Sequence, residues 1–275
     1  MNPFDLKNKE LITKYNLIAE KKFSQNFIID KSLTDKIARQ LKNIEKSNVI
    51  EIGSGPLTLT RSLIELPINK VTLIELDQKF SKLYQDIKPY YKQKIDYHFA
   101  DILQFDIKKI GNNLNIISNL PYKISSPFLL KSCENYEVIN QMVIMLQKEV
   151  AERIIAQPGS KNFGRLSVMM QSFFDVKKVM DLKAEAFFPK PKIASAIIYF
   201  KKNKKLPPII NISDLEHLTT ILFTKRRKKI RTILKDYRIN IPEIDFDKRP
   251  ENLVLEEFYQ LAYSLKKSAI NIKNN

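Results

Sequence analysis

The sequence has a single cysteine, Cys133, and two histidines, His98 and His217, in 275 residues. One cysteine cannot form a disulfide within the chain, which fits a reducing compartment such as the cytosol. Thiols and imidazoles are the usual zinc ligands, and a catalytic cysteine needs a histidine beside it. With so few of these groups, we expect neither a metal site nor a cysteine nucleophile.

Long apolar runs are also missing. No stretch approaches the ~18–20 apolar residues needed to cross a bilayer. The first residues, MNPFDLKNKELITKYN, lack the apolar core of a signal peptide. We therefore expect a cytoplasmic protein that has no membrane partner and acts as a monomer.

Acidic residues are outnumbered, with 30 Asp and Glu against 47 Lys and Arg and a formal net charge of +17. A surplus of this size favours a polyanionic partner, either nucleic acid or an anionic membrane surface. A lysine-rich composition with solvated charged faces is the alternative explanation. Hydrophobic residues make up 44% of the chain, enough for a packed core. The length suits one large domain and a small one.

Short β-rich runs alternate with helical patterns over most of the chain. This alternation predicts an α/β fold with a mostly parallel, doubly wound sheet, in which the last two strands form an antiparallel edge. Between those two strands, FFPKPK has two prolines and is expected to be irregular. The expected strands span residues 48–52, 70–76, 94–100, 114–118, 141–147, 176–182 and 193–202.

A charged segment with two prolines, KKNKKLPP at residues 201–208, is the expected linker. Beyond it the strand pattern stops and two long helices are predicted, over residues 213–237 and 251–267. Ser213, with Glu216 three residues later, forms a capping-box pattern at the start of the first. We expect a catalytic domain over residues 1–205, with an N-terminal substrate and cofactor loop, and a small all-α domain over 206–275.

The first candidate ligand site is the turn Gly53-Ser54-Gly55 between a strand and a helix. Glycines in such a turn let the backbone approach a ligand, and the helix that follows offers free N–H groups. A dinucleotide fingerprint requires a third glycine where Thr58 stands. The turn therefore argues against a nicotinamide enzyme.

Three further polar residues end the next strands. Glu75 lies 22 residues after Gly53, and Asp101 and Asn119 follow the third and fourth strands. These ends share the carboxyl edge of the sheet, where open α/β sheets bind ligands. A carboxylate at position 75 suits ribose hydroxyls, and Asp101 suits the adenine amino group. An acidic ribose site without a phosphate fingerprint favours S-adenosylmethionine over a dinucleotide.

The motif NLPY, residues 119–122, resembles the N/D-P-P-Y/F motif of methyltransferases that act on exocyclic amines. Over residues 21–260 the chain resembles the KsgA/RsmA family of small-subunit (16S) rRNA adenine N6,N6-dimethyltransferases. Ser24, Ser54 and Lys123 depart from the family's usual Gly, Pro and Asn. The motifs that carry the resemblance are KKFSQNFIID, EIGSGPLTLT, VTLIELD, SNLPYKISSP, MLQKEVAERI, GRLSVMMQ, FFPKPKIASAI and KRRKKIRTIL.

This resemblance implies a Rossmann-like class I S-adenosylmethionine-dependent methyltransferase domain. The implied cofactor contacts are Asn26, Ile28, Gly53, Glu75, Asp101 and Asn119. For catalysis, the Asn119 side-chain oxygen and the Leu120 carbonyl accept hydrogen bonds from adenine N6, and Pro121 fixes the backbone without a competing N–H. Tyr122 stacks on the flipped base, and Phe187, or its neighbour Phe188, covers the other face.

A basic stretch, KRRKKIR, lies on the first predicted helix of the small domain. A solvated helix face is one explanation, but beside a flipped-base site we expect contacts to RNA phosphates. That the nucleic acid is RNA follows from the family resemblance. The expected RNA-binding residues are Lys225, Arg226, Arg227, Lys228, Lys229 and Arg231.

Together these features predict an enzyme that methylates N6 of two adjacent adenosines in the 3′-terminal hairpin loop of small-subunit rRNA. A role in small-subunit biogenesis, with the pre-small subunit as partner, is expected with it. One alternative is a methyltransferase of the macrolide-resistance type, which acts on large-subunit rRNA. GRLSVMMQ and FFPKPKIASA favour the first. A second alternative is a binding module that assists ribosome assembly, against which the intact NLPY, Glu75 and Asp101 argue.

Overall fold

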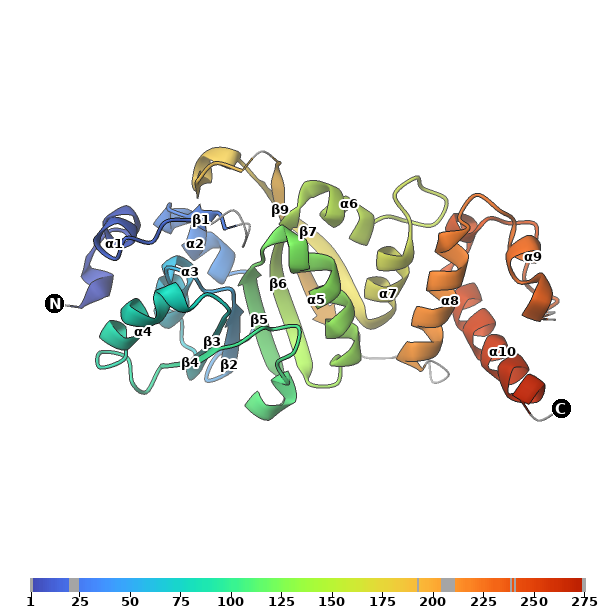
Figure 1. The fold of residues 1–275 in the computed structure, drawn as a ribbon, viewed down its shortest axis with the longest axis horizontal. Coiled ribbons are helices and arrows are strands. Elements are labelled where there is room, and N and C mark those ends of the chain that lie inside the picture. The colour runs from blue at the N-terminus through green and yellow to red at the C-terminus, as the bar shows by residue number, and fades with distance from the viewer. Residues whose placement is uncertain are drawn as a thin grey trace. The chain divides into compact units, whose positions relative to one another are not determined.

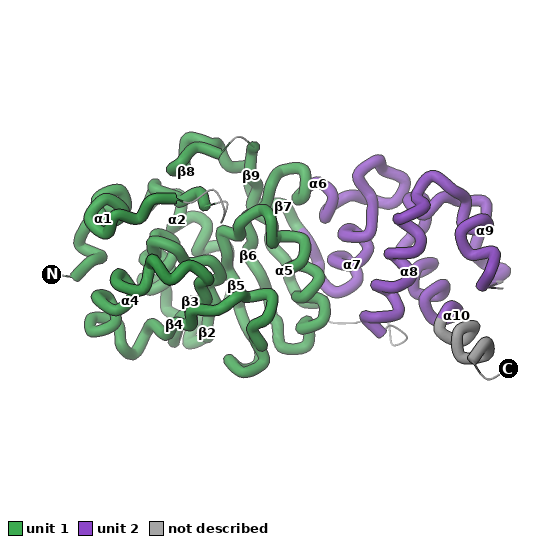
Figure 2. Tube along the Cα trace, in the orientation of Figure 1, with its two compact units in different colours: residues 1–151, 177–202 green, residues 152–176, 203–275 purple. Residues whose placement is uncertain are grey.

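The structure is a computed structural model, which describes residues 2–19, 25–191, 193–203, 211–237, 239 and 241–273. Ser24, which stands where the resembled family usually has Gly, lies outside these residues. The chain divides into two compact units, shown in Figure 2. One unit comprises Met1–Ala151 and Lys177–Lys202, and the other Glu152–Val176 and Asn203–Asn275.

This division differs from the expected boundary at residue 205, because Glu152–Val176 groups with the helical residues. Helix α7 (Arg165–Phe173) packs against α8 (Ile212–Thr224), and Arg165 Nη2 lies 2.5 Å from Glu216 Oε1. Contacts between side chains far apart in sequence, rather than the composition of the linker, decide this grouping.

The central sheet has seven strands in the order β4-β3-β2-β5-β6-β9-β7 (Figure 1). Strands β4, β3, β2, β5 and β6 run parallel to one another, and β9 is antiparallel to β6. The predicted mostly parallel, doubly wound sheet is therefore confirmed, and the last two strands, β9 and β7, lie at one side of it with β7 at the edge. The strands are β2 (Asn48–Ile52), β3 (Lys70–Glu75), β4 (Ile95–Phe99), β5 (Leu114–Asn119), β6 (Ile139–Gln147), β7 (Phe174–Leu182) and β9 (Ser195–Lys202).

Helices connect the parallel strands and cover the sheet. Strands β2 and β5 are buried along almost their whole length, as is typical of central strands in a parallel sheet covered on both faces. A second, two-stranded sheet joins β1 (Phe27–Ile28) to β8 (Phe187–Phe188). The remaining helices of this unit are α1 (Asn8–Lys14), α2 (Lys31–Ala38), α3 (Thr58–Ile64), α4 (Ser81–Ile87), α5 (Tyr122–Glu134) and α6 (Lys148–Ile154), which ends past the unit boundary.

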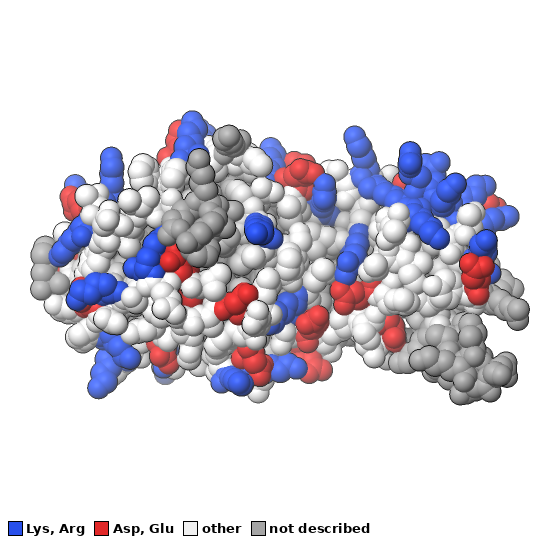
Figure 3. All heavy atoms as spheres, viewed as in Figure 1, with Lys and Arg blue, Asp and Glu red and all other residues white. Residues whose placement is uncertain are grey.

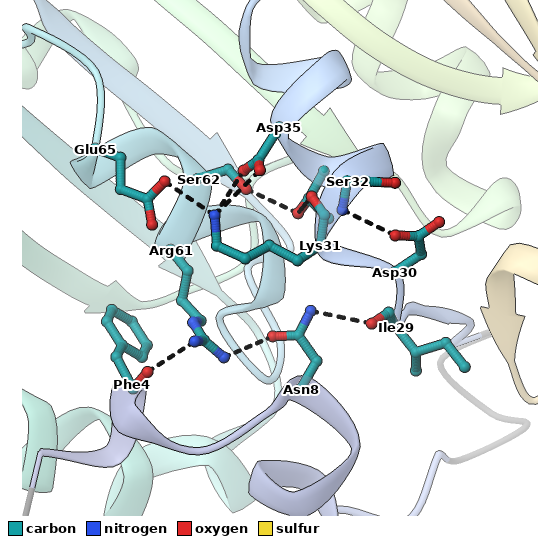
Figure 4. Close-up of polar contacts among 11 residues, drawn as sticks. Phe4, Asn8, Ile29, Asp30, Lys31, Ser32, Asp35, Arg61, Ser62 and Glu65 are labelled. Carbon is teal, nitrogen blue, oxygen red and sulfur yellow. Dashed lines mark hydrogen bonds and ion pairs between the residues drawn. The ribbon is translucent and has the colours of Figure 1, made fainter.

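One arginine attaches the N-terminal residues to this core (Figure 4). From α3, Arg61 donates hydrogen bonds to the carbonyl oxygens of Phe4 and Leu6, at 2.7 and 2.6 Å, and to Asn8 Oδ1 at 2.9 Å. Asn8 Nδ2 in turn donates to the Ile29 carbonyl at 3.2 Å, just after β1. Because Arg61 satisfies several backbone acceptors at once, it fixes the N-terminal segment against both α3 and β1.

The second unit is helical among its described residues. Its aromatic core includes Phe223 and Phe258, whose rings stack with centroids 5.9 Å apart, and Phe163 beside them. Helix α8 is capped by the Asn211 side chain, which accepts from the Ser213 N–H at 3.0 Å, so the predicted cap at Ser213 is wrong by two residues. The later helices are α9 (Ile230–Ile233) and α10 (Leu255–Lys273).

The prediction of one helix over 213–237, with the basic stretch on it, is also wrong. Helix α8 ends at Thr224, and residues 225–229 form a non-helical connection to α9. Five successive cations repel one another at helical spacing. The connection also lets Ile230 and Ile233 be buried, and the Ile230 N–H donates to the Lys248 carbonyl at 3.0 Å. Burial of the isoleucines thus outweighs the helical propensity of Lys and Arg.

Strand β2 carries a carboxyl group into the core. Glu51 is 2% exposed, and its Oε2 accepts a hydrogen bond from Thr60 Oγ1 at 2.6 Å. Burial raises the pKa of Glu51 to about 8; the Thr60 hydrogen bond opposes this shift and the charge of Glu75 adds to it. The group therefore keeps its proton at neutral pH, because a buried unpaired carboxylate is costly.

Replacing Glu51 with Gln should stabilise the protein at alkaline pH. The carboxyl ionises near 4.5 when unfolded but near 8 when folded, so the native state loses stability as pH rises between these values. Gln keeps the shape without this titration. We expect Glu51→Gln to raise the free energy of unfolding by about 1–3 kcal/mol at pH 9 and much less at pH 5, measured by urea denaturation. An equal effect at both pH values would contradict this account.

Candidate cofactor and catalytic site

A cavity of about 320 Å³ opens at the carboxyl ends of the parallel strands. All six expected cofactor residues line it, together with Leu120, Pro121 and Tyr122 of the expected catalytic set. The sheet thus brings together residues that are spread over almost a hundred positions of sequence. Phe187 is the one expected catalytic residue that does not line this cavity.

The turn after β2 has the conformation that its glycines predict. Gly53 and Gly55 have φ angles of +66° and +48°, which residues with a Cβ rarely adopt. Between them, Ser54 Oγ lies 2.8 Å from the Tyr84 hydroxyl, which also donates to the Gly55 carbonyl at 3.1 Å. Ser54, which stands where the resembled family usually has Pro, is therefore held in the turn by a hydrogen bond between its hydroxyl and that of Tyr84.

The Glu75 carboxylate is held by backbone N–H groups. Its Oε2 accepts from Gly55 at 2.8 Å, and its Oε1 accepts from Leu76 and Asp77, each at 2.9 Å. Burial raises the pKa of Glu75, while these three hydrogen bonds oppose the shift. A carboxylate has about four acceptor positions, so one remains for a ligand hydroxyl.

Asp101 stands at the end of the adjacent strand β4. Its Oδ1 accepts from the Leu103 N–H at 2.8 Å, which orients the carboxylate at the cavity wall. The exposed Leu76 side chain, 53% accessible, also lines the cavity. The wall here combines an acceptor for an amino group with an apolar surface, as an adenine ring requires.

The opening of the NLPY motif is fixed by one long-range hydrogen bond. Asn119 Nδ2 donates to the Asn26 carbonyl at 2.9 Å. This bond uses the donor end of the amide, and no described residue donates to its Oδ1. Asn119 therefore presents an acceptor, the group that the sequence-based mechanism requires of it.

The next two residues continue this wall. Pro121 is the N-cap of α5, and its carbonyl accepts from the Ile124 N–H at 3.0 Å. The Tyr122 hydroxyl lies 2.5 Å from Ser195 Oγ, and burial raises the pKa of the phenol. Because its hydroxyl is held by β9, the ring of Tyr122 has a fixed position at the cavity.

The expected second aromatic lies farther away. Phe187 is 3% exposed and belongs to the hydrophobic core, where it pairs across the small sheet with Ile28. Its neighbour Phe188 is 50% exposed and pairs with Phe27. Phe187 is therefore a buried partner of the cavity-lining strand β1, whereas the ring of Phe188 is exposed.

Sequence reasoning missed two charged or titratable residues of the cavity wall. Glu51 and Lys123 both line it. Glu51 precedes the glycine turn by two residues, but a strand pattern does not distinguish a buried carboxyl from an exposed one. Lys123, recognised only as a departure from the family pattern, is exposed beside Tyr122.

The six expected RNA-binding residues divide into two groups. Arg226 donates to the Lys161 carbonyl at 2.7 Å and pairs with Glu251 at 3.5 Å. Lys229 and Arg231 both pair with Asp247. The other members, which are exposed and form no ion pair with any described residue, are Lys225, Arg227 and Lys228. Figure 3 shows Lys and Arg side chains gathered over the connection between α8 and α9.

The described part of the chain contains no group of three or more His, Cys, Asp or Glu placed to hold a metal ion. None of its helices combines the length and apolar character that crossing a membrane requires.

Comparisons with known proteins agree with this geometry. A family model described as ribosomal RNA adenine dimethylase matches residues 16–266. The ribosomal RNA small subunit methyltransferase A of Ehrlichia ruminantium is 35% identical over 255 residues, covering 90% of this chain and 97% of its own. The protein of the same name from Legionella pneumophila strain Corby is 38% identical over 247 residues, covering 88% and 96%.

Solved structures share the fold. A dimethyladenosine transferase from Plasmodium falciparum superposes with a TM-score of 0.73 and 26% identity, covering 87% of this chain and 97% of its own. The 23S rRNA methyltransferase ErmE superposes with a TM-score of 0.62 and 22% identity, covering 88% and 100%. The expected class I methyltransferase fold is confirmed, and with the match over most of its length this chain belongs to the ribosomal RNA adenine dimethylase family.

Proposed function

We propose that the protein transfers methyl groups from S-adenosylmethionine to N6 of two adjacent adenosines in the 3′-terminal hairpin loop of small-subunit rRNA. The observation that carries the proposal is the orientation of Asn119, whose amide nitrogen is bound by Asn26 and whose oxygen is left as an acceptor in the cavity. The relatives named ribosomal RNA small subunit methyltransferase A support the choice of subunit.

The cavity can hold the cofactor by its nucleoside. Glu75 has an acceptor left for a ribose hydroxyl, and Asp101 for the adenine amino group. Asn26 and Ile28 close the same cavity from β1 and the residue before it. When bound, S-adenosylmethionine supplies a methyl group on a cationic sulfur.

The chain's own residues prepare the target amine. Adenine N6 is a poor nucleophile, because its lone pair is delocalised into the ring. The Asn119 oxygen and the Leu120 carbonyl accept its two hydrogens, which turns the lone pair toward the methyl carbon. The bound cofactor would supply the methyl group, its sulfur keeping the electron pair of the S–C bond. The two acceptors would stabilise the positive charge that develops on N6, and the N6 proton would then pass to water. Asn119 does not act as a base, since an amide binds no proton near neutral pH.

Aromatic residues receive the flipped base. Tyr122 offers a ring face whose position Ser195 fixes, with stacking worth about 1–3 kcal/mol. For the other face we retain Phe187 as a proposal; its burial means that the ring must be uncovered when RNA binds, whereas the accessible Phe188 needs no such change.

We further propose that the small domain over residues 206–275 binds RNA. We also propose that the protein works as a single chain in the cytoplasm during small-subunit biogenesis. The unpaired cations Lys225, Arg227 and Lys228 are the strongest support, because an ion pair within the protein competes with a phosphate. The paired Arg226, Lys229 and Arg231 contribute less, since Glu251 and Asp247 already bind them.

The deciding experiment offers the protein tritiated S-adenosylmethionine with unmethylated small subunits and, separately, with large-subunit RNA. We expect labelled dimethyladenosine in the small-subunit RNA only. Label confined to the large-subunit RNA would make the protein an enzyme of the macrolide-resistance type. An absence of label in both would favour a binding module.

Asn119→Ala should abolish turnover, because it removes an acceptor that the amine needs. Binding of small subunits and of the cofactor product should stay close to wild type, as measured by filter binding and calorimetry. Asn140→Ala, which removes an amide at the opposite end of the sheet, is the matched control and should keep full activity. Substantial turnover in Asn119→Ala would refute the acceptor role.

Removing the three unpaired cations should weaken RNA binding and its salt dependence. Each phosphate contact contributes about 0.7–0.9 to the slope of log K against log salt, so Lys225→Gln/Arg227→Gln/Lys228→Gln should lower the slope by about 2–3. Lys92→Gln/Lys108→Gln/Lys109→Gln removes the same charge from exposed lysines of the other unit as a control. Equal slopes for the two triple variants would show that net charge, and not this connection, binds the RNA.

A further inference from the structure

A second hollow of about 690 Å³ lies in the same unit as the cofactor cavity. It is formed by the end of α1, the turn that follows and α4. None of its lining residues lines the cofactor cavity, so it is a separate feature. We call it the tyrosine groove; its lining residues are Lys14, Tyr15, Asn16, Lys79, Lys82, Gln85, Asp86, Pro89 and Tyr90.

Two aromatic rings stand in the walls of this groove. The Tyr15 hydroxyl donates to Asp86 Oδ2 at 2.9 Å, which fixes the ring against α4. Tyr90 is 50% exposed, a high value for so large a side chain. Lys14 Nζ lies 5.9 Å from the centre of the Tyr15 ring. The exposed ring of Tyr90 and the ammonium group of Lys14 therefore both line the groove.

The charge of the groove is positive. Three lysines and one carboxylate line the groove, and that carboxylate, Asp86, already pairs with Lys82 at 2.7 Å. Lys82 and Tyr15 hold the pKa of Asp86 below its usual range, so the carboxylate stays ionised and bound. Lys79 pairs with Asp77 behind the groove, whereas Lys14 is exposed and forms no ion pair with a described residue.

Of these lysines, Lys14 and Lys82 are exposed and accessible to an anion. The Lys82 side chain is 73% exposed, and ion pairs at such positions contribute little stability, so a phosphate can take over the lysine. Figure 3 shows further Lys and Arg side chains over α1 and α4.

We infer that the tyrosine groove binds a single-stranded stretch of the small-subunit rRNA outside the target hairpin. A groove lined by exposed lysines and one exposed aromatic ring suits this ligand, because lysines follow the phosphates while a base stacks on the ring. The inference rests on the proposed function for the identity of the RNA. A second contact in the unit that carries the catalytic cavity would orient the target loop over Asn119.

The test measures binding of unmethylated small subunits, and of the isolated hairpin, in the presence of the cofactor product, so that it does not depend on methyl transfer. Tyr90→Ala and Lys14→Gln/Lys82→Gln should each weaken subunit binding about tenfold, in line with the loss of one stacked base or two phosphate contacts. Hairpin binding and cofactor affinity should not change. Lys108→Gln/Lys109→Gln, exposed lysines outside the groove, serves as the control.

Ultraviolet cross-linking followed by mass spectrometry supplies the second readout. We expect Tyr90 to be joined to a nucleotide of the rRNA outside the hairpin. Wild-type affinity in both groove variants, or a cross-link from Tyr90 to a ribosomal protein, would overturn the inference. Since these measurements record binding alone, a wild-type chain that binds subunits but transfers no label would refute the proposed function and leave the groove assignment standing.

Discussion

The Glu75 carboxylate is the constraint on which the site depends. It ends β3 and accepts N–H groups from its own strand end and from the glycine turn after β2. A buried carboxylate requires such partners, and the turn requires positive φ angles to supply one. The same bonds that satisfy Glu75 therefore set the shape of the cofactor turn. A residue with a Cβ at position 55 would therefore disturb both the positive φ angle of the turn and the hydrogen bond from its N–H to the Glu75 carboxylate.

The catalytic motif depends on a second long-range contact that reaches back to the N-terminal residues. Asn26 binds the Asn119 amide, β1 beside it pairs with β8, and Arg61 fastens the preceding segment through Asn8. Contacts between four distant parts of the sequence thus fix the orientation of the Asn119 amide in the cavity. The N-terminal segment acts as a structural part of the catalytic wall.

Much of this could be predicted from local pattern. The β-branched runs gave the parallel strands, and the polar residue at each strand end followed from the geometry of a parallel sheet, which is why Gly53, Glu75, Asp101 and Asn119 meet in one cavity. Where competition between distant groups decides, local pattern failed. The basic helix breaks because Ile230 needs burial, and the exposure of Phe187 and Phe188 is set by their pairing with β1.

Charge is distributed so that a cationic cofactor and a polyanionic substrate can share one surface. An ionised carboxylate near the RNA path would repel phosphates, yet a sulfonium needs negative charge beside it. Glu51 adds no charge to the cavity wall at neutral pH, because burial raises its pKa to about 8. The negative charge of the cavity therefore comes from Glu75 and Asp101, whose carboxylates lie at the ends of β3 and β4. Exposed Lys and Arg side chains, by contrast, lie over α1, over α4 and, most densely, over the connection between α8 and α9 (Figure 3).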